Sequence, residues 1–286
     1  MILGIIGAEN SHSQAIATII NVEKKMKGFS VGYLWGETAA FANDTAEAGR
    51  IPNIVKKPND MLGNVDAVLV DHRHPKYHLP AVRPFVERGI PVFVDKPFCF
   101  DPKEGAAFLK LVKKTGAPVT SFSVVPMQAS FAKFKKDMEG SGKIVAGSTY
   151  GPCDLESKWG GVFFYGIHQV EMVLMAFGYD VKSVLITKNG NGATGQLLYK
   201  DGKIVTMNLV KEGAPRFGIS AIGSDGAVHS GLPMDKSPYL NGVKTFCGMF
   251  RTGVAPIPHD LILRPVQVLD ALARSKKSGR MENVSS

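Results

Sequence analysis

The sequence predicts two kinds of fold within one chain of 286 residues. Residues 1–122 should form an α/β domain with a parallel sheet, and residues 123–286 an α+β domain with an open, mainly antiparallel sheet. In the first part, apolar strand-like runs alternate with helical patterns, which is typical of parallel sheets. In the second part, strand-like runs follow one another with Asn-Gly or Asp-Gly between them, which indicates hairpins.

The composition favours a globular protein of the cytoplasm. The three cysteines are far apart and form no CxxC pair, so we expect reduced thiols and no structural zinc. The apolar start, residues 1–7, lacks the basic segment and cleavage site of a signal peptide, so it reads as a first strand. The apolar runs are too short to span a membrane.

The net charge of +9 raises the question of a nucleic-acid partner. The lysines are spread in pairs over short helical segments, and no nucleic-acid-binding motif accompanies them. Solvated helix faces explain the charge best, an anionic small molecule comes second, and nucleic acid third. We therefore expect a small-molecule partner and no nucleic acid.

The chain opens with a strand, a glycine turn and a helix. Ile2 to Ile6 forms the strand, Gly7 begins the turn, and an apolar helical pattern follows His12. This order is that of a dinucleotide-binding Rossmann unit, although its fingerprint would also have Gly at Glu9 and at His12.

At the start of this helix, Asn10 and Ser11 can cap it, and an exposed helix N-terminus favours a phosphate. A capped turn without a ligand is the alternative.

A second strand, residues 29–34, ends shortly before Glu37. An acid at this place in a Rossmann unit binds the adenosine ribose. Glu37 is the candidate, and the alternative is an acid in the first turn of the following helix. NAD and NADP therefore both remain open as cofactors.

A third apolar run, Val65 to Val70, leads into a polar stretch, residues 71–78. His72, Pro75 and His78 should lie over the carboxyl edge of the sheet, where such folds bind ligands. His74 and His78 are four residues apart, but no HExxH motif or carboxylate set accompanies them, so we expect no metal.

Next comes an apolar run, Val92 to Val94, followed directly by Asp95, Lys96 and Pro97. Proline cannot donate to a strand ladder, so the strand must stop there and Lys96 lies at its carboxyl end. The alternative is an ordinary strand exit with an Asp-Lys pair in solvent. A helix capped by Asp101 and a strand over residues 118–122 complete this domain.

The second half contains a very apolar helix over residues 162–175 that carries His168. A lone histidine on such a helix is more often a core residue than a catalyst. Two further helices are expected near residues 238–250 and 259–277. The expected strands cover residues 181–187, 195–199, 204–210, 217–222 and 227–230.

Four segments, taken in order, resemble the glucose-fructose oxidoreductase, inositol dehydrogenase and MocA-like (Gfo/Idh/MocA) family. The stretch Asp95-Lys96-Pro97 is similar to the family's Glu-Lys-Pro signature, and Pro75 to His78 to its Pro-Asn-x-x-His segment. Gly160-Gly161 with Gly166-Ile167-His168 resembles its Gly-Gly and Asp-x-Gly-x-His helix, and residues 273–279 its closing helix. The chain departs from the pattern at Asp95, Glu9, His12 and Phe164, the last standing where the family has an aspartate.

The resemblance implies an NAD- or NADP-dependent oxidoreductase that acts on a hydroxyl or carbonyl carbon of a sugar, polyol or related small molecule. Lys96 would point at the substrate oxygen, and His168 would be the general acid or base, with Tyr165 as an alternative proton donor. The cofactor would contact Gly7, Asn10, Ser11, Glu37, His72, Pro75, His78, Asp95 and Lys96. A catalytically impaired sensor of cofactor or sugar is the alternative.

The substrate pocket is expected to draw on the second domain. Trp159 joins Lys96 and His168 as a substrate-binding candidate, and Tyr150, Asp154 and Lys158 are candidates by position alone. By analogy with relatives, we expect a homodimer or homotetramer formed through the second sheet.

Overall fold

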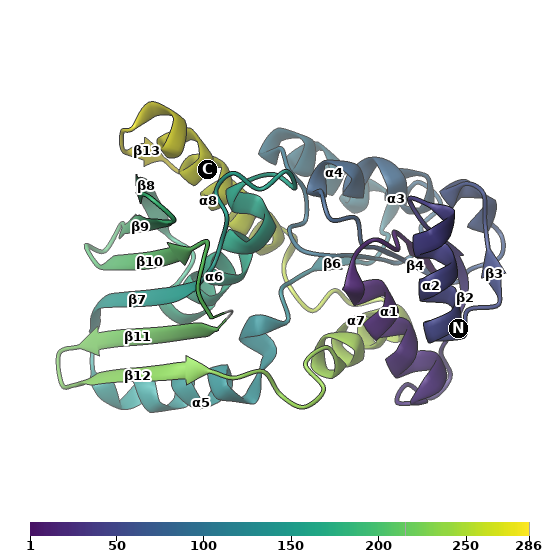
Figure 1. Cartoon of the computed structure of the whole chain (residues 1–286), viewed down its shortest axis with the longest axis horizontal. Helices are drawn as coiled ribbons and strands as arrows, with labels where there is room; N and C mark the ends of the chain where they lie inside the picture. Colours follow the sequence, from purple (N-terminus) through teal and green to yellow (C-terminus); the bar gives the residue numbers. More distant parts are fainter. Residues whose placement is uncertain (215, 286) are drawn as a thin grey trace. The chain divides into compact units, whose positions relative to one another are not determined.

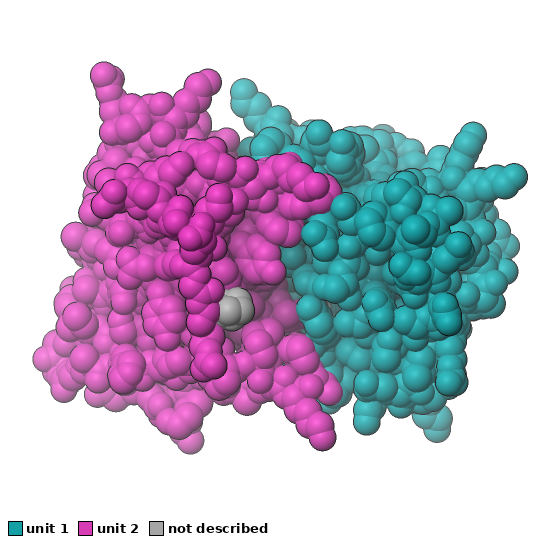
Figure 2. Space-filling model, viewed as in Figure 1, with its two compact units in different colours: residues 1–122, 239–262 teal, residues 123–238, 263–286 magenta. Residues whose placement is uncertain are grey.

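The computed structural model describes residues 1–214 and 216–285 (Figure 1). The chain divides into two compact units, coloured in Figure 2: unit 1 comprises residues 1–122 and 239–262, and unit 2 residues 123–238 and 263–286. The domains expected from the sequence differ from these units in residues 239–262. Phe246 in this segment stacks on Phe93 of unit 1, with ring centroids 4.7 Å apart. Residues 215 and 286 of the expected second domain lie outside the described residues.

Unit 1 is built on a six-stranded sheet with the order β3-β2-β1-β4-β5-β6. All its paired strands run parallel. The order reverses between β1 and β4, and open α/β sheets bind ligands at such a switch point, outside the carboxyl ends of the strands. The strands are β1 (Ile2–Ile6), β2 (Ser30–Trp35), β3 (Asn53–Ile54), β4 (Ala67–Val70), β5 (Val92–Val94) and β6 (Val119–Ser121).

The helices that connect these strands pack in two pairs, α1 with α2 and α3 with α4. Right-handed crossovers place such pairs on opposite faces of a doubly wound sheet. The bounds are α1 (Ser11–Ala17, continued by a π-helical turn at Thr18–Val22), α2 (Ala39–Gly49), α3 (His78–Val86), α4 (Pro102–Thr115) and α7 (Leu240–Thr252). Short 3₁₀ turns lie at Pro58–Met61 and Pro75–Tyr77. The predicted cap of α4 is confirmed, because the Asp101 side chain accepts the Lys103 N–H.

Unit 2 contains a seven-stranded sheet with the order β12-β11-β7-β10-β9-β8-β13. Its pairs are antiparallel except β7 with β10, which run parallel. The bounds are β7 (Ile144–Pro152), β8 (Val181–Asn189), β9 (Gly192–Tyr199), β10 (Ile204–Val210), β11 (Phe217–Gly223), β12 (Ala227–Leu232) and β13 (Glu282–Asn283). The helices are α5 (Ala129–Met138), α6 (Val162–Phe177) and α8 (His259–Ser278), with 3₁₀ turns at Val125–Met127 and Glu139–Ser141.

The hairpins expected from the sequence do not account for the whole sheet, because β7 inserts between β10 and β11. This strand was missed because its inward positions include glycines instead of large apolar residues. A Cβ at Gly147 would lie 2.3 Å from the Phe177 ring, and one at Gly151 2.4 Å from the Phe217 ring. Aromatic side chains of α6 and β11 fill the space above these glycines, so the sequence of β7 lacks the alternation of apolar residues that predicts a strand.

Helix α6 lies on the inward face of β7 (Figure 1). Gln169 fastens it there: its Oε1 accepts the Thr149 hydroxyl at 2.9 Å, and its Nε2 donates to the carbonyl of Gly151 at 3.1 Å. The neighbouring His168 is therefore held on a fixed helix. None of the described helices combines the length and the apolar character needed to cross a membrane.

Candidate functional site

Gly7 makes the turn from β1 to α1 possible. Its φ of +112° suits glycine, and a Cβ there would lie 2.8 Å from the backbone carbonyl of Asp71. The Gly7 N–H donates to the carbonyl of Trp35 at 2.9 Å. The turn is thereby pressed against the ends of β2 and β4, at the switch point of the sheet.

Glu37 lies beside this turn and is ionised. One carboxylate oxygen accepts the N–H groups of Ala8 and Glu9 at 2.8 and 3.0 Å, and the other lies 2.9 Å from His72 Nδ1. Burial alone would raise the pKa of Glu37, but the hydrogen bonds from His72 and Ala8 lower it to about 2. Thr38 is the cap of α2, so Glu37 precedes the helix and is not an acid of its first turn.

The start of α1 brings three polar side chains to the carboxyl edge of the sheet. Asn10 is the N-cap residue, and its Nδ2 donates to Asp71 Oδ1 at 2.7 Å. Ser11 is exposed. His12, in place of the last fingerprint glycine, has its Nδ1 3.1 Å from Asp95 Oδ1 and its ring 4.9 Å from the ring of Tyr239.

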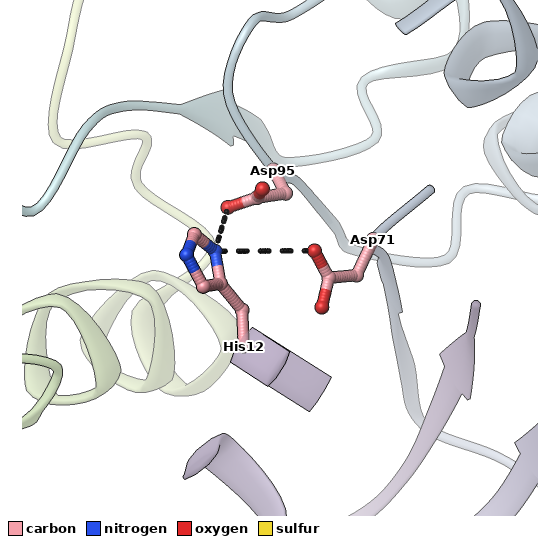
Figure 3. A group of neighbouring side chains, drawn as sticks. All are labelled: His12, Asp71 and Asp95. Carbon is pink, nitrogen blue, oxygen red and sulfur yellow. Dashed lines mark hydrogen bonds and ion pairs between the residues drawn. The ribbon is translucent and has the colours of Figure 1, made fainter. Parts of the chain in front are cut away.

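His12, Asp71 and Asp95 form one cluster, drawn in Figure 3. Their ligand atoms lie within 4.8 Å of one another, and both aspartates are buried. Burial and the neighbouring Asp95 carboxylate raise the pKa of Asp71 well above its ordinary value. For Asp95, burial acts in the same direction, but Lys96 and His12 outweigh it and hold the pKa well below the ordinary value. The pKa values of the two carboxyl groups are therefore shifted in opposite directions.

The contacts of Ser13 support a protonated Asp71 independently. Its Oγ lies 2.8 Å from the carbonyl of Gly7 and 2.6 Å from Asp71 Oδ2. A serine hydroxyl has a single hydrogen, so it cannot donate to both. A protonated Asp71 can donate to Ser13, which then donates to Gly7, and both contacts are satisfied.

An imidazole nitrogen and two carboxylate oxygens are also a donor set that metals bind. Here, however, these oxygens already have protein partners: Asn10 on Asp71, and His12 and Lys96 on Asp95. Hydrogen bonds and the Lys96 ammonium thus compensate the negative charge of the carboxyl groups in this cluster.

Lys96 is 8% exposed, and its Nζ lies 3.4 Å from Asp95 Oδ2. The alternative of an Asp-Lys pair in solvent is therefore wrong. A buried ammonium at the carboxyl end of β5 is costly unless it is paired, and Asp95 provides the pairing charge.

His78 links the two strand ends that carry the cluster. Its Nδ1 lies 2.9 Å from the carbonyl oxygen of Pro97 and its Nε2 2.8 Å from that of His72. Burial lowers the pKa of His78 to about 4. Both ring nitrogens face protein carbonyls, so this side chain connects the segments after β4 and β5. Pro75 is buried at the start of the 3₁₀ turn before α3.

In unit 2, His168 lies on α6 and is buried. Its Nδ1 is 2.7 Å from the Ser123 hydroxyl, and the Ser123 N–H donates to Glu171 Oε2 at 2.7 Å. The sequence offered no partner for this histidine, because Phe164 replaces the family aspartate. The partner lies 45 residues away, in the segment that follows β6.

Aromatic rings surround the same histidine. Tyr165 lies 5.5 Å and Phe217 5.6 Å from the imidazole, between ring centroids. Phe164 lies 5.0 Å from Tyr165 and 6.4 Å from Trp159, so the predicted Trp159 belongs to the same group of rings.

The other three candidates of unit 2 make different contacts. Tyr150 covers Gly218 on the sheet face opposite α6. Asp154 pairs with Lys211 at 3.4 Å, and the Lys158 ammonium lies 4.6 Å from the Trp159 ring.

Comparisons with known proteins agree with this architecture. Residues 1–122 match the sequence model GFO_IDH_MocA, an oxidoreductase family with an NAD-binding Rossmann fold. The chain is 29% identical to the uncharacterized oxidoreductase YhhX of Escherichia coli (strain K12) over 164 residues, which are 50% of this chain and 47% of that protein. The chain thus spans about half of this relative.

Among solved structures, the fold is similar to that of myo-inositol 2-dehydrogenase from Lactobacillus plantarum, with a TM-score of 0.88 and 17% identity over 100% of this chain and 99% of that chain. It is also similar to scyllo-inositol dehydrogenase from Lactobacillus casei with bound NAD(H) and scyllo-inositol, with a TM-score of 0.86 and 14% identity over 100% and 99%. Residues 1–122 thus resemble the Rossmann domain of the Gfo/Idh/MocA oxidoreductases, and the whole chain has a fold similar to that of these inositol dehydrogenases.

Proposed function

We propose that this protein is an NAD-dependent oxidoreductase that acts on the hydroxyl or carbonyl carbon of a sugar, polyol or related small molecule. The observation that carries the proposal is the buried ion pair of Lys96 and Asp95 at the carboxyl end of β5. The desolvation of an ammonium group is unfavourable, so a buried lysine at the ligand-binding edge of a Rossmann sheet calls for a function.

The residues at the switch point fit a dinucleotide. The turn at Gly7 has no room for a side chain, which brings the backbone close to the sheet edge where a pyrophosphate binds. Glu37 is ionised at the end of β2, where an acid binds the ribose hydroxyls of NAD and repels the additional phosphate of NADP. We therefore assign NAD as the preferred cofactor.

When bound, the nicotinamide supplies or accepts the hydride. The Lys96 ammonium stabilises negative charge on the reacting oxygen, and Asp95 keeps the ammonium in place. His168 is the proposed general acid or base, acting through Nε2, and the Ser123 hydroxyl contacts its Nδ1. Tyr165 is a second proton donor candidate, since its ring lies against His168 and its side chain is 40% exposed.

The alternative of an impaired sensor rested partly on Phe164, which appeared to leave His168 without a partner. The hydroxyl of Ser123 at 2.7 Å removes that reason. We therefore favour the enzyme.

The test is titration of the purified full chain with NADH and NADPH, followed by fluorescence of Trp35 and Trp159 and by calorimetry. Turnover is then measured with inositols, other polyols and sugars in both directions. Saturable NADH binding and turnover of at least one polyol or sugar support the proposal. Binding without turnover would favour the sensor, and no binding of either cofactor would overturn both.

We also propose that the protein forms a homodimer or homotetramer through the open face of the unit 2 sheet. Side chains directly across from one another share a face, and three such rows on the open face carry no Lys, Arg, Asp or Glu. The rows are Tyr150, Asn208, Thr194 and Gly218; Ser148, Thr206, Gln196 and Ser220; and Ala146, Ile204, Leu198 and Ile222. Light scattering should give an oligomer that Ile222→Asp dissociates; a monomeric wild type would contradict this.

A further inference from the structure

Ser123 has three described contacts, all within unit 2. It is 1% exposed, and its N–H donates to Glu171 Oε2 at 2.7 Å. Its Oγ accepts the N–H of Val125 at 3.1 Å and lies 2.7 Å from Nδ1 of His168. The serine is thus fixed by its own backbone, and its hydroxyl is turned toward the imidazole.

These contacts decide where the hydroxyl hydrogen goes. The Val125 N–H donates to a lone pair of Oγ, so the hydroxyl hydrogen of Ser123 still needs an acceptor of its own. A buried hydroxyl needs an acceptor, and among the described partners of Oγ the imidazole Nδ1 is the group that can accept. Nδ1 of the neutral ring then carries a lone pair, and the ring proton lies on Nε2.

We propose that Ser123 is a positioning residue that holds neutral His168 in the tautomer protonated at Nε2. The neutral ring therefore carries its hydrogen on Nε2 and a lone pair on Nδ1. A carboxylate partner, as at the family position held here by Phe164, can only accept and would fix the opposite tautomer. The role in turnover rests on the proposed function, whereas the tautomer itself does not.

Serine can accept as well as donate, so its hydroxyl can follow a change in the charge of the ring. When the neutral ring takes up a second proton from solvent, at Nδ1, the Ser123 hydroxyl turns and accepts the Nδ1–H of the imidazolium. The imidazolium then gives its Nε2 proton to a substrate oxygen and becomes neutral, with its hydrogen on Nδ1. Loss of the Nδ1 proton to solvent and uptake of a proton at Nε2 restore the resting tautomer and the donation from Ser123 to Nδ1.

The experiment is two-bond ¹H–¹⁵N correlation spectroscopy of the ¹⁵N-histidine-labelled full chain at a pH where the ring is neutral. The His168→Gln variant identifies the resonances of this residue among the seven histidines. We expect a protonated Nε2 and an unprotonated Nδ1 in the wild type and in Ser123→Thr, which keeps the hydroxyl. Ser123→Ala should give a mixture of both tautomers, and Ser123→Asp should place the proton on Nδ1.

Thr120→Val is the matched control, because the Thr120 hydroxyl on β6 is buried and has no hydrogen-bond partner in the described part of the chain. Its spectrum of His168 should equal that of the wild type. A wild-type ring protonated at Nδ1, or a Ser123→Ala spectrum identical to the wild type, would overturn the proposal. Should Ser123→Ala fail to fold, the wild type and Ser123→Asp still decide it.

Turnover provides the second readout. We expect Ser123→Ala to lose about five- to tenfold in turnover, the effect of one hydrogen bond, and Ser123→Thr to recover most of it. Unchanged turnover in Ser123→Ala would overturn the positioning role. If the wild type turns over no substrate, the proposed function fails, while the spectra still decide the tautomer.

Discussion

The surroundings of Lys96 in unit 1 and of His168 in unit 2 are built on different chemistry. Around Lys96, the neighbours Asp95, Asp71 and His12 are all ionisable. Their electrostatic interactions shift the pKa values of the two aspartates. Around His168, the described contacts include a serine hydroxyl and the rings of Tyr165 and Phe217. The comparison teaches that charge balance fixes the state of one key residue, while hydrogen-bond direction and packing fix the other.

The largest effects should come from removing the two key residues themselves. We expect Lys96→Met and His168→Ala each to lower turnover by roughly a hundredfold or more, because a charge-stabilising group or a proton-transfer group is lost. Steady-state kinetics on the substrate found by screening provides the measurement. A variant with near-normal turnover would remove its residue from the mechanism.

The two aspartates beside Lys96 should respond differently to the same substitution. Asp95→Asn leaves the buried Lys96 ammonium without its counter-charge and should lower the free energy of unfolding by about 3 kcal/mol. Asp71→Asn should change it by less than about 1 kcal/mol, since an amide can donate to Ser13 and accept from Asn10 as the protonated acid does.

Urea denaturation of both variants at neutral pH tests this pair of expectations. Equal destabilisation would show that both carboxyl groups are charged, and the assignment of the proton to Asp71 would then be wrong.

Glu37 gives a pH-dependent prediction. Its pKa in the folded protein is about 2, below the ordinary 4.5, so its charge stabilises the fold above pH 4.5 and this contribution is lost as the pH falls toward 2. Glu37→Gln should therefore be less stable than the wild type by about 2 kcal/mol at pH 7. The difference should shrink steadily below pH 4.5, as followed by thermal or urea unfolding. A difference that does not depend on pH would contradict the ionised, hydrogen-bonded carboxylate.

The smallest effect separates the ring of Tyr165 from its hydroxyl. Tyr165→Phe keeps the aromatic contact with His168 at 5.5 Å and should lower turnover less than about threefold if His168 handles the proton. Tyr165→Ala, which also removes the ring, is the comparison variant. A hundredfold loss in Tyr165→Phe would make the tyrosine the proton donor.

Much of unit 1 could be predicted from the sequence because its signals are local. The strands before Gly7, Asp71 and Asp95 are apolar runs, and a proline directly after Lys96 marks where the strand ends. The helix α4 was predicted from its cap, Asp101. In unit 2, α6 and the hairpin strands were predicted, whereas β7 and α5 were missed and α7 was assigned to the other part of the chain.

The site itself was predicted only in part. Lys96 was expected at a strand end, and the structure adds that it is buried and paired. His12 was treated only as a missing glycine, although a histidine at the start of a helix beside two strand-end aspartates is a usable signal. Ser123 gave no signal of its own, since it is one of many serines after a short strand.

What the sequence determined by itself is the alternation of strands and helices in residues 1–122 and the placing of Lys96 at the carboxyl end of a strand. These follow from hydrophobic pattern, glycine turns and proline, which act between neighbours in the chain. The tertiary structure alone decided the opposite pKa shifts of Asp71 and Asp95 and which group faces Nδ1 of His168. Both depend on distances of a few ångströms between residues far apart in sequence, 24 between Asp71 and Asp95 and 45 between Ser123 and His168. Burial makes such distances decisive, because electrostatic and hydrogen-bonding energies rise steeply away from water.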